Sequence, residues 1–131
     1  MGFVIPHTSV MNLMETKSNC EYQVTCIMNT IQGLAMQSAA VTQLQTGASQ
    51  AYLAQNTDEE GCPTEAAIAY ANSDAFNAKY NSMLKSIQVK EQNLNLLKQQ
   101  LTTKITSLTA SIESFQKLRE NNTQKLFKYG N

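Results

Sequence analysis

The side chains best suited to metal binding or nucleophilic attack in this chain are one histidine and three cysteines, His7, Cys20, Cys26 and Cys62. Such chemistry needs several of these groups close together, or a cysteine beside a general base. His7 has no acid or cysteine at metal-binding spacing, and Cys20 and Cys26, which are six positions apart, point in different directions on a helix. No base accompanies Cys62. We therefore expect no metal site, no cofactor and no catalytic residue.

The charged residues and the sequence motifs also argue against an enzyme. The acidic cluster 58–60 lacks the alternating ligands of a calcium-binding loop. The chain contains no GxSxG, no Walker loop and no GxGxxG. Nucleic-acid binding needs basic residues on one stripe, whereas the nine basic residues after position 61 are spread around the expected helix and mixed with acids. We expect neither an enzyme nor a nucleic-acid-binding protein.

The composition favours long helices and permits association between copies. The 131 residues include only 15% charged residues, five glycines and two prolines, and 48 residues are Gln, Asn, Ser or Thr. The formal net charge is zero, so copies do not repel one another. Residues 1–61 carry one lysine against five acids, and residues 62–131 carry nine basic residues against five acids. These opposite charges can attract within one chain or between chains.

The stretch from Tyr22 to Thr57 contains no Asp, Glu, Lys or Arg. It is not a membrane span, because polar residues interrupt each apolar run well short of the roughly 18 residues that a span needs. An exposed helix normally carries charges on its outer face, so we expect this outer face to be covered. The odd cysteine count and the lack of a visible signal peptide predict a cytoplasmic protein, or one exported without a cleaved leader.

Residues 9–55 are predicted to form the first helix, after an arm over residues 1–8 in which Pro6 discourages helix. Thr8 or Ser9 can serve as its N-cap. A heptad repeat begins at Val10, and ten of its thirteen a and d positions are apolar, which is typical of a coiled-coil seam. The a and d positions are Val10, Leu13, Lys17, Cys20, Val24, Ile27, Ile31, Leu34, Ser38, Val41, Gln45, Ala48 and Tyr52.

A turn over residues 56–64, with Gly61 and Pro63, precedes a second helix over residues 65–129, in which a break near Asn72 is left open. The apolar stripe of this helix mostly alternates spacings of four and three, and the two fours around Leu101 predict a stutter. The predicted stripe is Phe76, Tyr80, Met83, Ile87, Lys90, Leu94, Leu97, Leu101, Ile105, Leu108, Ile112, Phe115, Leu118, Asn122, Leu126 and Tyr129.

Two long helices joined by one short connector predict an all-α fold, a long antiparallel helical hairpin of the coiled-coil type in a single domain, residues 1–131. Each helix of such a hairpin buries only one stripe, which is thin support for a chain of this length. We therefore expect further burial through self-association, in a multi-helix bundle or a filament.

The first helix also has a second candidate packing face. From Cys26 to Ala54, position c of its heptad holds only small residues, and each of the two glycines among them costs about 1 kcal/mol relative to alanine. A groove for the close approach of another helix explains this stripe, while chance in an alanine-rich segment or a kink at a glycine are the alternatives. The chain end is amphipathic and can dock on a neighbour. The predicted self-association interface is Cys26, Gly33, Met36, Ala40, Leu44, Gly47, Ala54, Phe127 and Tyr129.

The layout of the whole chain resembles bacterial helical-hairpin filament subunits, the class of type III secretion needle proteins and of the coiled-coil core of flagellin. The turn Gly61-Cys62-Pro63-Thr64 is similar to the proline-containing turn of needle subunits. The chain departs from them in lacking paired prolines, in its greater length and in its three cysteines. The resemblance implies subunits that stack through both termini and the hairpin seam, in an extracellular filament.

Two functional hypotheses remain from the sequence. The first is a structural subunit that self-assembles into a filament, tube or helical bundle, with copies of itself as its partners. The alternative is an intracellular coiled-coil adaptor or chaperone-like hairpin that binds a partner helix in its groove.

Overall fold

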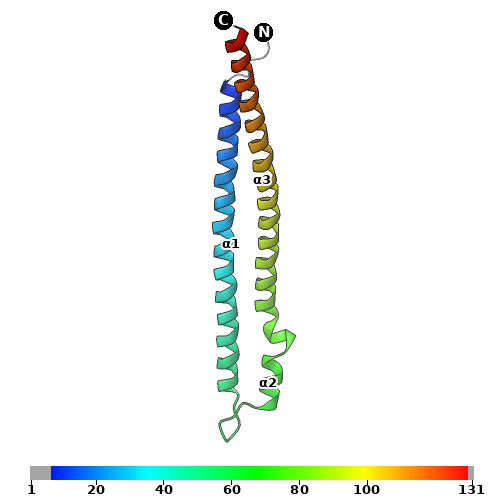
Figure 1. The fold of residues 1–131 in the computed structure, drawn as a ribbon. Helices are drawn as coiled ribbons and strands as arrows, with labels where there is room; N and C mark the ends of the chain where they lie inside the picture. Colours follow the sequence, from blue (N-terminus) through cyan, green and yellow to red (C-terminus); the bar gives the residue numbers. More distant parts are fainter. Residues whose placement is uncertain (1–6, 130–131) are drawn as a thin grey trace. The chain divides into compact units, whose positions relative to one another are not determined.

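The computed structural model describes the backbone of residues 7–129 and the side chains of residues 9–124. Within this part, the chain is an all-α helical hairpin, as predicted, built from α1 (His7–Gln55), α2 (Glu65–Ala71) and α3 (Asp74–Tyr129) (Figure 1). Helix α1 takes in two residues of the expected N-terminal arm, and the rest of that arm lies outside the described residues. The break near Asn72, which the sequence left open, is present and separates α2 from α3.

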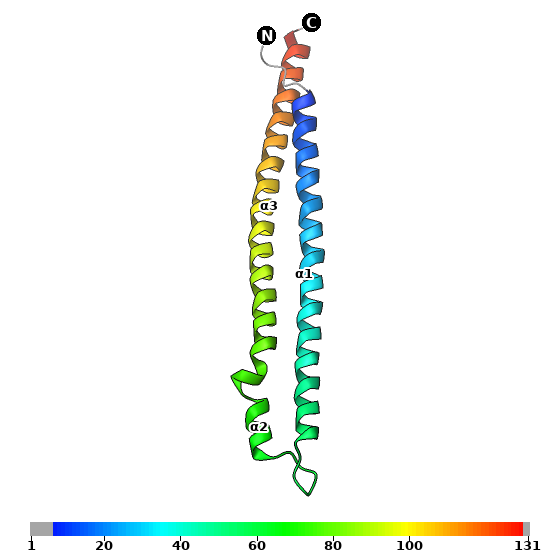
Figure 2. The same ribbon diagram turned by 180° about the vertical axis from the view of Figure 1, so that it is seen from behind.

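The chain divides into two compact units. Unit 1 comprises residues 1–28 and 95–131, and unit 2 comprises residues 29–94. In unit 1 the beginning of α1 lies beside the C-terminal part of α3, and in unit 2 the remainder of α1 lies beside α2 and the beginning of α3 (Figure 2). The sequence pattern gives no sign of this division, because both apolar seams continue across it.

The predicted seam of α1 is confirmed at every position. Five of its residues are buried, and the other eight, including the polar Lys17, Ser38 and Gln45, are half-buried. A strict alternation of three and four residues therefore defines the packed side of α1 from beginning to end. The five buried positions are Val10, Cys20, Ile27, Leu34 and Val41.

The predicted seam of α3 is wrong at four described positions, and the stutter at Leu101 is absent. Met83, Lys90, Leu97 and Leu118 are exposed. The residues that follow each of them, Leu84, Glu91, Lys98 and Arg119, are half-buried instead. One unbroken alternation of three and four is then buried or half-buried along α3, namely Asn77, Tyr80, Leu84, Ile87, Glu91, Leu94, Lys98, Leu101, Ile105, Leu108, Ile112, Phe115, Arg119 and Asn122.

This correction has a physical cause in the pairing of the helices. A stutter would rotate the packed side of α3 away from a partner that keeps a regular heptad. Three charged residues therefore occupy α3 seam positions, where long side chains can lay their aliphatic parts along the seam and keep their charged ends near water. Apolar side chains that the sequence placed in the seam become part of the surface.

The buried core of unit 2 is a cluster of Leu34, Val41 and Ile87. Tyr80, Leu84 and Leu94 pack against it as half-buried neighbours. Removing a large aliphatic side chain from water contributes about 1.5–3 kcal/mol, so this cluster is a main source of stability in unit 2.

A tight loop connects α1 to α2. The backbone N–H of Gly61 donates to the carbonyl of Asp58 at 3.1 Å, and one Asp58 carboxylate oxygen accepts hydrogen bonds from the N–H groups of Glu60 and Cys62. Gly61 has a φ of 84°, which only glycine adopts without strain. The loop thus uses its first acid for its own structure. Thr64 is the N-cap of α2, because its side-chain oxygen accepts a hydrogen bond from the N–H of Ala67.

Three aromatic rings join the three helices in unit 2. Tyr52 of α1, Tyr70 of α2 and Phe76 of α3 lie with ring centroids 5.0–5.6 Å apart. The rings are tilted or edge to face, which are favourable arrangements for aromatic pairs. This triangle holds the short helix α2 against its two longer neighbours.

The side chain of Asn77 forms hydrogen bonds across the break between α2 and α3. Its side-chain amide donates to the carbonyls of Ala71 and Ser73, at 3.1 and 2.9 Å. Its side-chain oxygen accepts a hydrogen bond from the amide of Gln45 on α1. One half-buried amide therefore satisfies backbone groups released by the break and ties them to the opposite helix.

We expect Asn77→Ala to lower the free energy of unfolding by about 2 kcal/mol, because it leaves two carbonyls and the Gln45 amide without this partner. Asn81→Ala, an exposed position on the same helix, is the matched control. Chemical denaturation followed by circular dichroism measures both. Equal effects of the two substitutions would show that the bridge does not stabilise unit 2.

The corrected α3 seam makes a second prediction. Leu84→Ala should lower the free energy of unfolding by about 2 kcal/mol, and Met83→Ala by less than about 0.5 kcal/mol, because Leu84 packs on the core whereas Met83 is exposed. The same denaturation experiment, run on dilute samples, compares the pair. A larger loss for Met83→Ala would restore the register predicted from the sequence.

Candidate interaction surface

The residues with potential catalytic chemistry are scattered in the structure. Cys20 is buried in the α1 seam, as predicted for a small core residue, and Cys26 and Cys62 are exposed. The Cys26 side chain, through a hydrogen bond and its electrostatic effect, raises the pKa of the exposed Tyr22 phenol. Among the side chains described, no three of His, Cys, Asp or Glu gather where they could hold a metal ion. The side chain of His7 lies outside the described residues.

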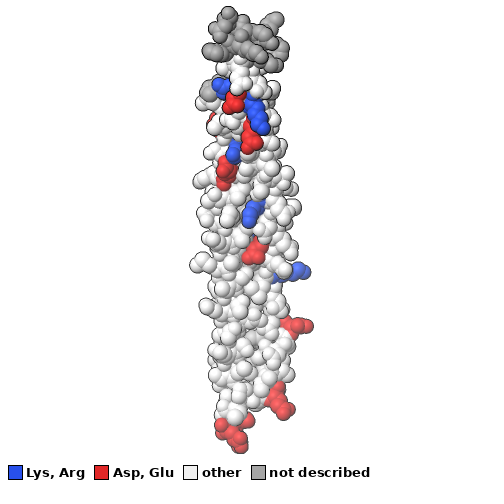
Figure 3. Space-filling model, viewed as in Figure 1, with Lys and Arg blue, Asp and Glu red and all other residues white. Residues whose placement is uncertain are grey.

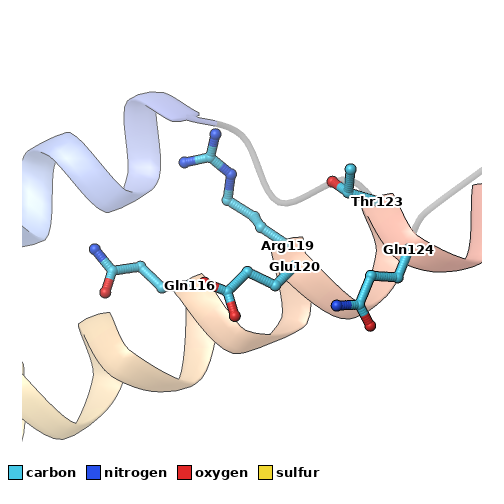
Figure 4. Close-up of a pocket in the computed structure, with 5 residues that line it drawn as sticks. All are labelled: Gln116, Arg119, Glu120, Thr123 and Gln124. Atoms are coloured by element: carbon cyan, nitrogen blue, oxygen red, sulfur yellow. The ribbon is translucent and has the colours of Figure 1, made fainter. Parts of the chain in front are cut away.

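A polar pocket on α3 in unit 1 offers no better candidate. Its lining residues all come from this one helix, and Arg119 extends toward the beginning of α1 while Glu120 points elsewhere (Figure 4). A ligand site needs polar groups that converge from several directions, and this surface does not provide them. The lining residues are Gln116, Arg119, Glu120, Thr123 and Gln124.

None of the helices, over the described part of the chain, has an apolar stretch long enough to cross a lipid bilayer. The apolar side chains on the surface are instead distributed along the outer faces of α1 and α3.

The predicted self-association residues lie on the surface of α1 wherever their side chains are described. Met36 and Leu44 expose 74% and 61% of their surface. Cys26, Ala40, Gly47 and Ala54 are also exposed, and Gly33 is half-buried. Cys26 belongs to unit 1, and the other residues belong to unit 2. The side chains of Phe127 and Tyr129 lie outside the described residues.

The two glycines of this face are not required by the packing of the chain. A Cβ atom built on Gly33 or Gly47 would meet no atom within 4 Å, and neither residue has a positive φ. Helix α1 also continues without interruption through both positions. The cost of a glycine inside a helix is therefore not repaid by any contact within the described structure.

The same side of α1 carries no charge. Residues 22–57 contain no acidic or basic residue, and the corresponding part of α1 is uncoloured in Figure 3. An exposed helix surface of this length normally carries several charges, which keep neighbouring molecules soluble and apart. Here α1 presents to its surroundings uncharged polar side chains, small residues and the large side chains of Tyr22, Met28, Met36 and Leu44.

A groove of about 490 Å³ runs between α1 and α3 in unit 2, beside the small-residue face. Small side chains, among them Ala40 and Ser86, leave it open above the core residues Val41 and Ile87. We call it the unit 2 groove. Its lining residues are Gln37, Ala40, Val41, Ser82, Met83, Ser86, Ile87 and Lys90.

The sequence prediction found the α1 side of this groove and missed its α3 side. It placed Met83 and Lys90 inside the seam, whereas both are exposed at the rim of the groove. The regular heptad of α1 was the signal that could have corrected the α3 register, because it requires an equally regular partner.

No family model matches the chain, and neither a curated protein nor a solved structure matches it.

The open space at the glycines can be tested by stability measurements. We expect Gly33→Ala and Gly47→Ala each to raise the free energy of unfolding of the dilute chain by about 0.5–1 kcal/mol, because alanine favours helix and meets no obstacle. Gly61→Ala should instead lower it by about 1 kcal/mol, since its φ of 84° disfavours any side chain. Destabilisation at Gly33 or Gly47 would mean that the fold itself requires a glycine there.

Proposed function

We propose that the protein is a non-catalytic structural subunit that assembles with copies of itself through the outer face of α1. The observation that carries this proposal is the exposed, charge-free surface of α1 in unit 2, which includes Met36, Leu44 and two glycines with open space above them. A filament, tube or helical bundle of such subunits would cover this surface.

The energetics of helix packing support this proposal. Small residues let two helix backbones approach closely, which increases dispersion contacts along their length. The exposed side chains of Met36 and Leu44 would lie on either side of such a contact and lose their apolar surface to water. Uncharged glutamines and serines can be buried at lower cost than ions, provided that they hydrogen-bond across the interface.

The proposal predicts association that depends on concentration. Analytical ultracentrifugation and light scattering should show species that grow as the chain is concentrated, and negative-stain microscopy should show their form. A chain that stays monomeric would reject the self-assembling subunit, and one that stops at a small dimer or tetramer would reject the filament.

The interface itself is tested by Gly33→Leu combined with Gly47→Leu. We expect this variant to lose the large assemblies and keep its helix content, because leucine fits the helix but blocks close approach of a neighbour. Ala39→Leu with Thr46→Leu places two leucines at exposed positions on another side of α1 and serves as the control. Assembly that persists in the glycine variant would exclude this face as the interface.

A further inference from the structure

The beginning of α1, in unit 1, carries an exposed strip of methionines. Met14, Glu21 and Met28 follow one another at intervals of seven residues, so they lie along one line of the helix, with Met11 beside them. Met11, Met14 and Met28 expose 55%, 50% and 46% of their surface. We call Met11, Met14, Glu21 and Met28 the methionine strip. Methionine side chains are flexible and polarizable, and they adapt to irregular apolar hollows.

The strip and the unit 2 groove have complementary charges. The exposed charged groups on and next to the strip are Glu15, Glu21 and, from α3, Glu113. Lys17, which is half-buried in the seam, lines the same hollow as Met14 and Glu21. The one charged residue that lines the groove is Lys90, and α1 contributes no charge to it. A strip with acidic groups therefore matches a groove with a basic rim.

The net charges of the two units favour the same pairing between copies. Unit 2 contains six acids and three lysines, a net charge of −3, and unit 1 contains four acids and seven basic residues, a net charge of +3. Contact between unit 2 of one copy and unit 1 of another is attractive, whereas two copies of the same unit repel each other.

We propose that the unit 2 groove, which lies beside the small-residue face, takes the methionine strip of a second copy; this contact rests on the self-association proposed above and adds a second surface to it. The methionines enter the hollow above Val41 and Ile87, and Glu21 pairs with Lys90 at its rim. The small side chains of Ala40 and Ser86 provide the room. Groove and strip are different surfaces, so each added copy leaves one of each unfilled, and growth can continue.

Charge exchange tests the pairing in the full chain. Lys90→Glu and Glu21→Lys should each weaken self-association about three- to tenfold, because each places like charges in contact. The combined variant, Lys90→Glu with Glu21→Lys, should return to within about threefold of the unchanged chain. Sedimentation velocity over a concentration series measures all of them.

Two single substitutions provide matched controls. Lys85→Glu makes the same change of charge on an exposed position of α3 that does not line the groove. Glu59→Lys makes the opposite change in the exposed loop. Both should associate like the unchanged chain, within about twofold. Loss of association in these controls equal to that of Lys90→Glu would mean that total charge, and not the groove, governs association.

Disulfide trapping gives a readout of proximity. One chain carries Met83→Cys, a second chain with a different tag carries Met14→Cys, and both carry Cys26→Ser and Cys62→Ser. Oxidation of the mixture should yield a heterodimer, and Gln92→Cys in place of Met83→Cys should yield much less, because Gln92 does not line the groove.

The outcomes separate this proposal from the function on which it rests. An unchanged chain that does not self-associate would overturn both. Self-association that is insensitive to Lys90→Glu and Glu21→Lys, or that the combined variant does not recover, would overturn the pairing of groove and strip and leave self-assembly through another surface in place. Equal yields of the disulfide-linked heterodimer with Met83→Cys and with Gln92→Cys would also overturn the pairing of groove and strip.

Discussion

The seven-residue period of the α1 seam is the constraint on which the rest of the packing depends. From Val10 to Tyr52 its buried and half-buried positions alternate by three and four without exception. In each unit, a helix that packs along this seam must present its own side chains at the same period. The register of α3 is therefore set by the geometry of its partner, and the apolar residues of α3 follow that register only in part.

This constraint explains why large apolar side chains are exposed although the chain has charged residues that could have taken their places. Glu91, Lys98 and Arg119 are held at seam positions, while Met83 and Leu97 are on the outside. A hairpin of two helices has no third layer to cover such residues. Burial against another molecule is the remaining way to remove them from water, which connects the internal packing to the proposed assembly.

The features that could be predicted from the sequence are those that depend on a single helix. The α1 seam followed from its own apolar period, and the exposure of Met36 and Leu44 followed from their heptad positions. The α3 seam could not be read in the same way, because choosing the most apolar stripe of a single helix ignores the partner. The bridge between Gln45 and Asn77 was also beyond prediction, since it joins amides 32 residues apart whose meeting depends on the fold.

The regular period also makes length a modular property of this hairpin. Seven residues inserted between Leu34 and Val41, matched by seven between Ile87 and Leu94, would add one layer to the unit 2 core and return every later side chain to its present face. An insertion of one residue would instead rotate all later side chains by about 100° and expose the seam. Descendants of such a chain can therefore change length in steps of paired heptads, while single-residue insertions within the helices are selected against.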